Sequence, residues 1–412
     1  MRQRLCSLLA LIALLAAACS GDSTDSAADT AVDDTTTEAP ATTAAPETTA
    51  EPTTTTESTT TTAAPLADLE LLGAGPYDVG VITIEIANDA NERPLTVDVW
   101  MPLVDGTTGD PHEYTLIAGS YYPSPEAISA TADALATDGP FPLVLYSHGS
   151  GGLRYIHSSY TETIASHGYV VVAPDHTGNT AVDVIAGSGT EPELTAWNRV
   201  NDARAVLDAM TDPANEVTAP FQAAIDSERI AVTGHSFGGF TAHAIVSGFS
   251  STFGSVEGDD RVGAIISLAP FTRPILNDEQ LAAIDVPNLL IGASDDITTP
   301  VDPNVDDPWE LAVSEDAARV VLVGAEHESF TDVCKMVEAL PEIDTVAPFV
   351  VEALEARTEA GCDPDDLQID RVEDLTETFA VSFLDTVFKG GQMIDPDAVA
   401  LPDDALYERR GF

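Results

Sequence analysis

The sequence predicts an α/β fold with a mostly parallel central β-sheet flanked by helices. Three observations support this prediction: short apolar runs, helical segments between them, and the regular alternation of the two. Strands that are covered on both faces of a parallel sheet read as nearly continuous apolar runs. Six such runs occupy residues 143–146, 169–173, 229–233, 262–268, 287–291 and 319–323. Strand and helix in alternation give parallel pairing through right-handed crossovers.

Helices are expected between and after these strands, at residues 157–166, 193–210, directly after residue 236, and at 372–388. Ahead of the first parallel strand, residues 81–86 and 95–101 predict an antiparallel hairpin region. We assign residues 66–412 to one large domain, because this length is well above the size at which a hydrophobic core is hard to build.

Residues 229–240 read Arg-Ile-Ala-Val-Thr-Gly-His-Ser-Phe-Gly-Gly-Phe and contain the most informative motif of the chain. A β-branched run ends in Gly-x-Ser-x-Gly, and small and apolar residues continue as a helix. Between a strand and a helix this pattern predicts a nucleophile elbow, a turn so tight that the serine is strained and exposed. Side chains at positions 234 and 238 would collide with the neighbouring strand and helix. Ser236 is therefore the candidate nucleophile.

A serine hydroxyl needs a general base that a carboxylate orients, and in this architecture the chain order is Ser, acid, His. The strand at 319–323 is followed by Gly-Ala-Glu-His, which makes His327 the candidate base; a surface-loop histidine is the alternative. The strand at 287–291 is followed by Gly-Ala-Ser-Asp-Asp, which leaves a choice between Asp295 and Asp296. Aspartates are also common as turn-capping residues in loops.

Four blocks of sequence carry a resemblance to a known family: Val-Leu-Tyr-Ser-His-Gly-Ser at 144–150, Ala-Ser-His-Gly-Tyr-Val-Val-Val-Ala-Pro-Asp-His at 165–176, Gly-His-Ser-Phe-Gly-Gly at 234–239, and Leu-Ile-Gly-Ala-Ser-Asp-Asp-Ile-Thr-Thr-Pro-Val at 290–301. They resemble the α/β-hydrolase branch that holds the platelet-activating-factor acetylhydrolase-like enzymes, the predicted dienelactone hydrolases and the cutinase-like polyester hydrolases. The resemblance implies an α/β-hydrolase fold. In the cutinase-like members the catalytic aspartate precedes a proline by four residues, which favours Asp296, with Asp295 as the alternative.

The resemblance also implies an oxyanion hole formed by the backbone N–H groups of Ser150 and Phe237. The chain departs from the polyester hydrolases at two positions. Ser150 stands where those enzymes usually place an aromatic residue, and Phe271 follows Ala-Pro where they tend to carry Trp. An aromatic clamp for a polymer ring is thinner here, so small soluble esters are the favoured substrates. We expect Phe271 and His235 to line the substrate pocket; a core aromatic is the alternative for Phe271.

Residues 1–18 are expected to be a lipoprotein signal peptide. Positive charge at the start precedes an apolar run at 8–18 that is too short to span a membrane. The run ends in Leu-Ala-Ala-Ala-Cys-Ser-Gly, which resembles a bacterial lipoprotein cleavage site with Cys19 as the lipidated residue. An ordinary secretory signal cut near the same alanines is the alternative. Residues 19–65, rich in Thr, Ala, Glu and Pro, cannot bury a core and are expected to be a disordered linker.

These segments predict an extracytoplasmic protein, held at the bacterial cell surface or secreted. Outside the cytoplasm the two remaining cysteines, Cys334 and Cys362, most simply form one disulfide. Two free buried thiols are the alternative. We interpret residues 328–368 as an insertion after the candidate base. The disulfide would hold this insertion in place as a cap over the pocket.

The net charge of the chain limits the classes of molecule that it is expected to bind. Sixteen Lys and Arg against 69 Asp and Glu give a formal net charge of −53. No basic patch exists to follow a phosphate backbone, so nucleic-acid binding is disfavoured. The same field repels anionic substrates and anionic lipid head groups. Contact with a membrane is therefore expected only through the lipid anchor.

No metal site is expected, since the chain lacks His-Glu-x-x-His and any Cys-rich zinc pattern. The Asp-rich residues 302–307 are interpreted as a solvated acidic loop, with a calcium site as the alternative. We interpret His148, His157 and His176 as loop-fixing or pocket-wall residues. In the helix at 193–210, Arg199 and Asp202 are expected to form a structural ion pair.

Together the residues predict a serine hydrolase that cleaves carboxylic esters of short to medium acyl chain through an acyl-enzyme. It is expected to be a monomer without a cofactor, acting on small or polymeric esters, with polyesters and lipid esters among the candidates. Peptidase or thioesterase activity with the same triad is the weaker alternative, because the sequence gives no sign of an extended substrate-binding cleft. A hypothesis of a different class is a non-catalytic binding or adhesion lipoprotein on a hydrolase fold.

Overall fold

The computed structural model describes residues 66–88, 93–115, 121–339, 357–358, 360–363 and 365–412. The expected signal peptide (1–18), Cys19 and the expected linker (19–65) lie outside the described residues, as does part of the expected insertion at 328–368. Residues from Ala67 to Phe412 form one compact unit.

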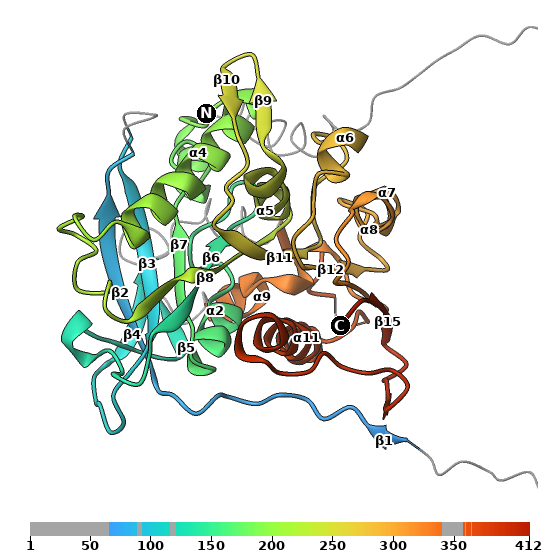
Figure 1. Ribbon diagram of the computed structural model, residues 1–412, viewed down its shortest axis with the longest axis horizontal. Helices are drawn as coiled ribbons and strands as arrows, with labels where there is room; N and C mark the ends of the chain where they lie inside the picture. The colour runs from blue at the N-terminus through green and yellow to red at the C-terminus, as the bar shows by residue number, and fades with distance from the viewer. Residues whose placement is uncertain (1–65, 89–92, 116–120, 340–356, 359, 364) are drawn as a thin grey trace, which may run out of the picture. The chain divides into compact units, whose positions relative to one another are not determined.

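An eleven-stranded sheet runs through the described part of this unit (Figure 1). From edge to edge its strands are β15 (Ala405–Arg410), β13 (Ala317–Leu322), β12 (Asn288–Ala293), β11 (Val262–Leu268), β8 (Ile225–His235), β6 (Phe141–Ser147), β7 (Val170–Pro174), β3 (Leu95–Pro102), β2 (Val79–Ile86), β5 (Tyr121–Ser129) and β4 (Pro111–Thr115).

The six central strands, from β13 to β7, are parallel to one another. Each corresponds to one of the six apolar runs in the sequence, within a few residues at the ends. Strands β2 and β3 pair antiparallel, as expected for the opening hairpin region. The prediction of an α/β fold with a mostly parallel sheet is confirmed.

Four long helices cover the sheet and divide its core in two. On one face α2 (Ser158–Ser166) and α11 (Ile369–Lys389) pack against side chains such as Val144 and Ile266. On the other face α4 (Pro192–Thr211) and α5 (Phe237–Ser247) pack against side chains such as Leu145 and Val232. Successive side chains of a strand point to opposite faces, so each central strand contributes to both cores. Burial on both faces is the reason these strands read as unbroken apolar runs.

The remaining elements are short and lie in the connections. They are β1 (Ala67–Asp68), η1 (Ala132–Ala134), α3 (Ala181–Ala186), β9 (Phe249–Ser251), β10 (Gly254–Val256), α6 (Asp278–Leu281), α7 (Val301–Asn304), α8 (Asp306–Leu311), η2 (His327–Phe330), α9 (Val333–Ala339) and β14 (Val399–Ala400). Among the described helices, none combines the length and apolar composition that crossing a bilayer requires.

The edge strands were not predicted from the sequence. Strand β15 reads Ala-Leu-Tyr-Glu-Arg-Arg, with Ala405 and Tyr407 buried and Leu406 and Glu408 exposed. The opposite edge strand β4 and its neighbour β5 mix exposed and buried positions in the same way. A strand with one solvated face lacks the continuous apolar run used to find the central strands.

Acidic side chains are buried between α2 and the segment that leads to α11. Asp332 accepts hydrogen bonds from the hydroxyls of Ser158 (2.5 Å) and Ser159 (2.6 Å). Glu373 on α11 forms an ion pair with Lys335. Burial raises the pKa of Glu373 to about 7; the nearby Asp332 carboxylate adds to this shift and Lys335 opposes it. Burial likewise raises the pKa of Asp332.

We expect the stability of the domain to fall as pH rises from about 4.3, the ordinary pKa of Glu, through the pKa of about 7 of Glu373 in the folded state. Over this window the folded protein holds a proton that the unfolded chain has released, so stability decreases with pH. Glu373→Gln should flatten this dependence, and melting temperatures from pH 4.5 to 8 measure it. The matched control is Glu338→Gln, at an exposed position of α9. Equal slopes for wild type and Glu373→Gln would contradict the expectation.

Candidate active site

Ser236 stands between the end of β8 and the start of α5, where the backbone turns most sharply. It is one of the few non-glycine residues with positive φ in the described chain, with φ 55° and ψ −116°. Such a conformation costs free energy and persists only where the surroundings enforce it. The strained turn lifts the hydroxyl to the C-terminal end of the parallel strands.

The two glycines of the motif are required by close packing. A Cβ atom at Gly238 would lie 1.8 Å from the carbonyl oxygen of Ser147, and one at Gly234 would lie 2.5 Å from the carbonyl carbon of Gly238. Real Cβ atoms do not come this close to backbone, so both positions exclude any side chain. The absence of side chains lets α5 approach the end of β6.

Three side chains from distant parts of the chain meet at this point. The Nε2 atom of His327 lies 2.9 Å from the Oγ atom of Ser236, and its Nδ1 atom lies 2.7 Å from Oδ2 of Asp296. The three residues follow β8, β12 and β13, which are parallel and therefore end at the same edge of the sheet. Both distances fall in the range that proton transfer between a nucleophile and its base requires.

The environment favours a carboxylate paired with a basic imidazole. Burial by itself would lower the pKa of His327, but the Asp296 carboxylate outweighs burial and raises it. Burial would raise the pKa of Asp296, but His327 and hydrogen bonds from Thr299 lower it. The backbone N–H groups of Thr298 and Thr299 donate to Oδ1 of Asp296 at 2.8 and 2.7 Å. The aspartate is thus held ionised and in a fixed orientation.

Of the two candidate acids, Asp296 is the one in contact with the histidine. It is 4 % exposed, whereas Asp295 is exposed and accepts a hydrogen bond from Ser294. The Thr299 hydroxyl lies 2.7 Å from Oδ2 of Asp296 and 3.1 Å from Nδ1 of His327. Thr299 was not singled out from the sequence, because a hydroxyl in a loop carries no recognisable spacing.

The expected oxyanion donors lie on either side of Ser236. Phe237 opens α5, so its N–H has no carbonyl four residues earlier in the helix to bond. Ser150 follows β6, next to Gly149, where a Cβ atom would lie 3.3 Å from the Cβ atom of Ser236. Two backbone N–H groups beside a nucleophile are able to stabilise a developing oxyanion.

His148 and His176 fix the loop that carries Ser150. The backbone N–H of His176 donates to Nε2 of His148, so the proton of His148 is on Nδ1, which donates to the carbonyl of Gly149 at 2.7 Å. Burial lowers the pKa of both rings well below the ordinary value and keeps them neutral. His157 is also buried and stacks on Tyr160.

The two expected pocket residues differ in position. Phe271 is half-buried and packs edge-on against Phe237, with ring centroids 6.2 Å apart. His235 is 1 % exposed, and its Nε2 atom lies 2.9 Å from the carbonyl oxygen of His327. This corrects the expectation for His235: its ring lies beneath the candidate base instead of in an open pocket wall. Burial lowers its pKa to about 4, with the neighbouring His327 adding to the shift.

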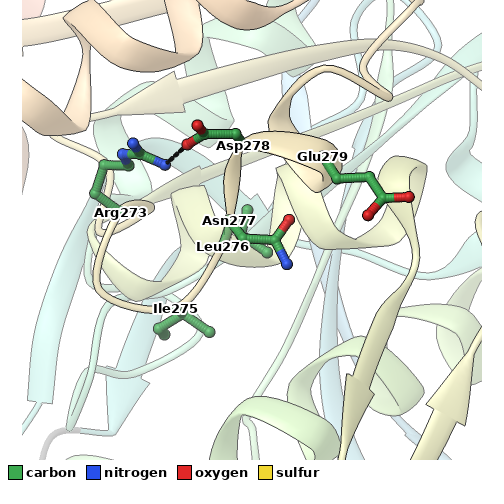
Figure 2. A pocket seen from close by; sticks show the side chains of 6 residues that line it. All are labelled: Arg273, Ile275, Leu276, Asn277, Asp278 and Glu279. Atoms are coloured by element: carbon green, nitrogen blue, oxygen red, sulfur yellow. Dashed lines mark hydrogen bonds and ion pairs between the residues drawn. The ribbon is translucent and has the colours of Figure 1, made fainter.

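Away from the triad, a surface depression is lined by the loop before α6 (Figure 2). Its lining residues are Arg273, Ile275, Leu276, Asn277, Asp278 and Glu279. Arg273 donates to Asp278 at 2.6 Å across it. The depression contains no histidine, cysteine or serine and offers no nucleophile.

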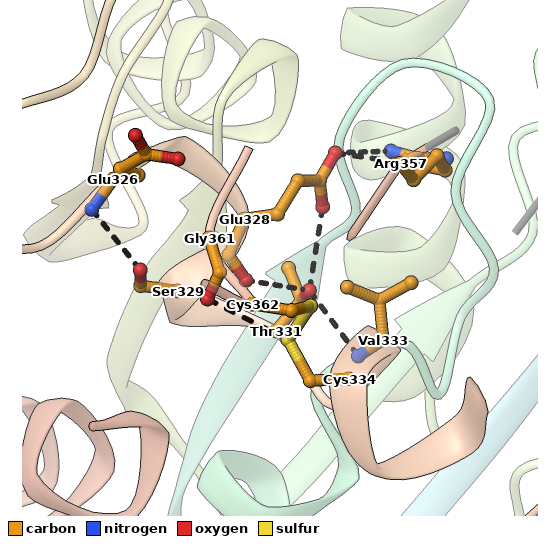
Figure 3. Close-up of a disulfide and its surroundings, with 9 residues drawn as sticks. All are labelled: Glu326, Glu328, Ser329, Thr331, Val333, Cys334, Arg357, Gly361 and Cys362. Atoms are coloured by element: carbon orange, nitrogen blue, oxygen red, sulfur yellow. Dashed lines mark hydrogen bonds and ion pairs between the residues drawn. A yellow bond between two sulfur atoms is a disulfide. The ribbon is translucent and has the colours of Figure 1, made fainter. Parts of the chain in front are cut away.

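The disulfide joins Cys334 at the start of α9 to Cys362 (Figure 3). This agrees with the expected pairing. The described residues beside Cys362 contact the loop of the candidate base, since the N–H of Glu328 donates to the carbonyl of Ala360 at 2.7 Å. Arg357 forms an ion pair with Glu328 at 2.9 Å. Burial would raise the pKa of Glu328, but Arg357, His235 and His327 together lower it to about 2.

Arg357 also contacts the loop that carries Ser150, since its Nη1 atom donates to the carbonyl of Gly151 at 2.7 Å. Arg357 and Ala360 therefore link the loop after β6 to the loop after β13. Neither Glu328 nor Arg357 was identified from the sequence. Their pairing spans the expected insertion, and only the fold brings them together.

Among the described residues, no group of three or more His, Cys, Asp or Glu side chains is arranged to hold a metal ion. In the acidic segment at 302–307, Asp306 pairs with Arg319 and Asp307 pairs with Arg273. These aspartates serve as ion-pair partners of neighbouring elements.

Comparisons with known proteins were made on sequence and on fold. A family model described as PET hydrolase-like matches residues 158–377, more than half of the chain. One described as platelet-activating factor acetylhydrolase, isoform II, matches residues 89–197. Cutinase 2 of Thermobifida cellulosilytica is 33% identical over 158 residues, 38% of this chain and 49% of that protein. Chlorophyllase-1 of Citrus unshiu is 28% identical over 200 residues, 48% of this chain and 52% of that protein.

The chain therefore spans about half the length of the curated relatives it matches. A solved structure of a ferulic acid esterase from Streptomyces cinnamoneus superimposes with a TM-score of 0.58 at 22% sequence identity. The superposition covers 84% of this chain and 99% of that one, and it supports the same fold.

Replacing both cysteines, as Cys334→Ser with Cys362→Ser, should loosen the bridge between the two loops. We expect faster hydrogen exchange at residues 326–333 and 148–152, with exchange in β8 unchanged, because the disulfide fixes the segment that carries Arg357. The melting temperature should also fall, since removing a native disulfide typically costs about 2–5 kcal/mol in small secreted domains. Mass spectrometry of deuterium uptake measures the effect, and wild type under reductant is the matched control. Unchanged exchange in both loops would show that the bridge holds without the disulfide.

Proposed function

The chain belongs to the PET hydrolase-like family of α/β-hydrolases, and from this premise we propose that it is a serine hydrolase of carboxylic esters. The observation that carries the proposal is the hydrogen-bonded series Asp296, His327, Ser236, with distances of 2.7 and 2.9 Å. The names of the relatives support the same chemistry, since cutinases and acetylhydrolases are among them.

In the proposed mechanism Ser236 attacks the acyl carbon of the ester while His327 accepts the proton of the hydroxyl. The tetrahedral intermediate places its negative charge on the former carbonyl oxygen, between the N–H groups of Phe237 and Ser150. Collapse expels the alcohol, to which His327 returns the proton, and leaves an acyl-enzyme. Water then attacks with the same proton transfer and releases the acid. Asp296 orients the imidazole and stabilises its charged form throughout.

The proposed substrates are uncharged esters with short to medium acyl chains. The net charge of −53 repels anionic molecules. Ser150 at the oxyanion loop and Phe271 at the rim provide less flat aromatic surface than a polymer ring requires. Polyesters and lipid esters remain part of the substrate series to be assayed.

The proposal includes export and anchoring through a lipidated Cys19. Two findings agree with a location outside the cytoplasm: the Cys334–Cys362 disulfide and the cysteine at the end of an apolar N-terminal run. A binding or adhesion lipoprotein would share this location, so turnover is what separates the two functions.

Ser236→Ala should abolish turnover of p-nitrophenyl acetate and butyrate by the purified protein, because no other group in the proposed mechanism forms the acyl-enzyme. Loss of a triad member typically costs about 10⁴–10⁶-fold in kcat. Ser247→Ala, a serine at the far end of α5, is the matched control and should retain wild-type activity. Equal rates for wild type and Ser236→Ala would eliminate the enzyme and favour the binding lipoprotein.

The pH profile should report the titration of the base. Only neutral His327 accepts the serine proton, so kcat/KM should fall on the acid side with an apparent pKa above 6.5, because Asp296 raises the pKa of the histidine. Asp296→Asn should move this limb to lower pH and reduce kcat by about 10⁴-fold. Asp295→Asn, at the exposed neighbour, should change neither. If Asp295→Asn is the damaging variant, the assignment of the acid is wrong.

A further inference from the structure

Arg199 on α4 is a buried cation in a chain with few cations. The chain carries 16 Lys and Arg against 69 Asp and Glu, yet this guanidinium has no exposed surface. A buried charge is costly unless it is well hydrogen-bonded. Asp202, one turn further along α4, ion-pairs with Arg93 and lies 3.1 Å from His176. The hydrogen bonds of Arg199 point toward the loop after β6.

Two of these bonds end on backbone carbonyls of that loop, and two others end on the side chain of Asn179. Nη1 of Arg199 donates to the carbonyl of His148 at 2.5 Å, and Nη2 donates to the carbonyl of Gly149 at 2.9 Å. Nε and Nη2 donate to Oδ1 of Asn179 at 2.9 and 2.6 Å. Asn179 in turn accepts the N–H of Gly151 on its backbone carbonyl and lies 3.3 Å from Oγ of Ser150 through its side-chain amide.

This pattern fixes the direction of one N–H group. The carbonyl of Gly149 and the N–H of Ser150 belong to the same trans peptide unit, so they point in opposite directions. Because the carbonyl is held on the Arg199 side, the N–H of Ser150 points away from Arg199. Gly149 itself lies beside Ser236, as the 3.3 Å approach of a Cβ atom to the serine shows.

The same guanidinium touches the second oxyanion residue. Its central carbon lies 4.7 Å from the ring centroid of Phe237, in the geometry of a cation–π contact. Arg199 therefore contacts Phe237 and the peptide unit that carries the N–H of Ser150. On the far side of the loop Arg357 holds the carbonyl of Gly151. The N–H groups of Gly151 and Gly152 donate to the carbonyls of Asn179 and Gly149, which leaves the N–H of Ser150 to face the substrate.

We propose that Arg199 is a positioning residue for the oxyanion hole, holding the Gly149–Ser150 peptide in the orientation that catalysis requires and supporting Phe237 from below. The proposal rests on the proposed ester hydrolysis. Oxyanion donors act only when they lie at about 2.7–3.1 Å from the oxygen that becomes negative, so a rotated peptide loses transition-state stabilisation. Ground-state substrate binding does not depend on this donor to the same extent.

The geometry of these contacts requires an arginine at position 199. Its planar fork reaches two consecutive carbonyls and Asn179 at once, whereas a lysine ammonium is a single point donor on a flexible stem. Arg199→Lys keeps the charge and loses the fork. Arg199→Met removes both. The matched control is Arg204→Met on the same helix, whose guanidinium contacts Asp259 and the carbonyl of Gly258.

The test measures kcat, KM and inhibition by a trifluoromethyl ketone, which forms an oxyanion on Ser236, beside a methyl ketone of the same shape that does not. For Arg199→Lys we expect kcat to fall about 10–100-fold, less than the roughly 10²–10³-fold loss from deleting a donor. KM and methyl-ketone binding should change by less than about threefold, while trifluoromethyl-ketone binding weakens in step with kcat/KM. Arg204→Met should match wild type in kcat, in KM and in the binding of both ketones.

Asn179→Ala is the second variant, because Asn179 is only half-buried and its loss leaves the core intact. It should lower kcat and trifluoromethyl-ketone binding in the same direction with a smaller factor. Melting temperature and circular dichroism establish that each variant is folded. Unchanged kcat in folded Arg199→Lys and Asn179→Ala would overturn the proposal, as would a kcat loss without weaker trifluoromethyl-ketone binding. A wild-type protein without turnover would instead refute the ester hydrolysis on which the proposal rests.

Discussion

The close approach of helix α5 to the end of strand β6 is the constraint on which the rest of the site depends. Gly238 sits so near Ser147 that a Cβ atom would lie 1.8 Å from the carbonyl oxygen. This contact bends the chain at Ser236 into a conformation with positive φ and brings the loop after β6 beside the serine. The proposed nucleophile and one proposed oxyanion donor are neighbours because two pieces of backbone have no side chain between them.

Electrostatics then arranges the rest of the site around that turn. Asp296 is held ionised by backbone N–H groups and raises the pKa of His327. Arg199 and Arg357 approach the loop after β6 from two sides and occupy its carbonyl oxygens. Two of the 16 cationic side chains of this acidic chain are thus used close to the backbone of the site.

The sequence predicted the parts of the fold that rest on continuous patterns. The six central strands were found because burial on both faces makes them uniformly apolar, and Ser236 was found because a tight turn requires glycines at fixed spacing. The choice of Asp296 over Asp295 needed family resemblance, since two adjacent loop aspartates are indistinguishable by pattern. Edge strands such as β15 were not predicted, because a strand with one solvated face lacks a continuous apolar run.

The contacts that position the site residues could not be predicted from the sequence. Burial lowers the pKa of Arg199 to about 9 and the Asp202 carboxylate opposes this shift, so the two charges that were expected to pair do interact. Their spacing on one helix did not reveal that the side chains also reach the loop after β6 and Arg93. His235 was expected in the pocket wall, but its ring is buried against His327. Such partners are decided by tertiary packing between segments far apart in the chain.

The spacing of the three site residues along the chain has a consequence for how the protein matures. Ser236 and His327 are 91 residues apart, and each reaches its place only after a different parallel strand has joined the sheet. Long-range pairing of this kind forms slowly during folding. A partly assembled chain holds the hydroxyl and the imidazole apart, so the proton transfer proposed between them requires β13 to have joined the sheet. Reactivity of Ser236 during refolding would then report the docking of β13.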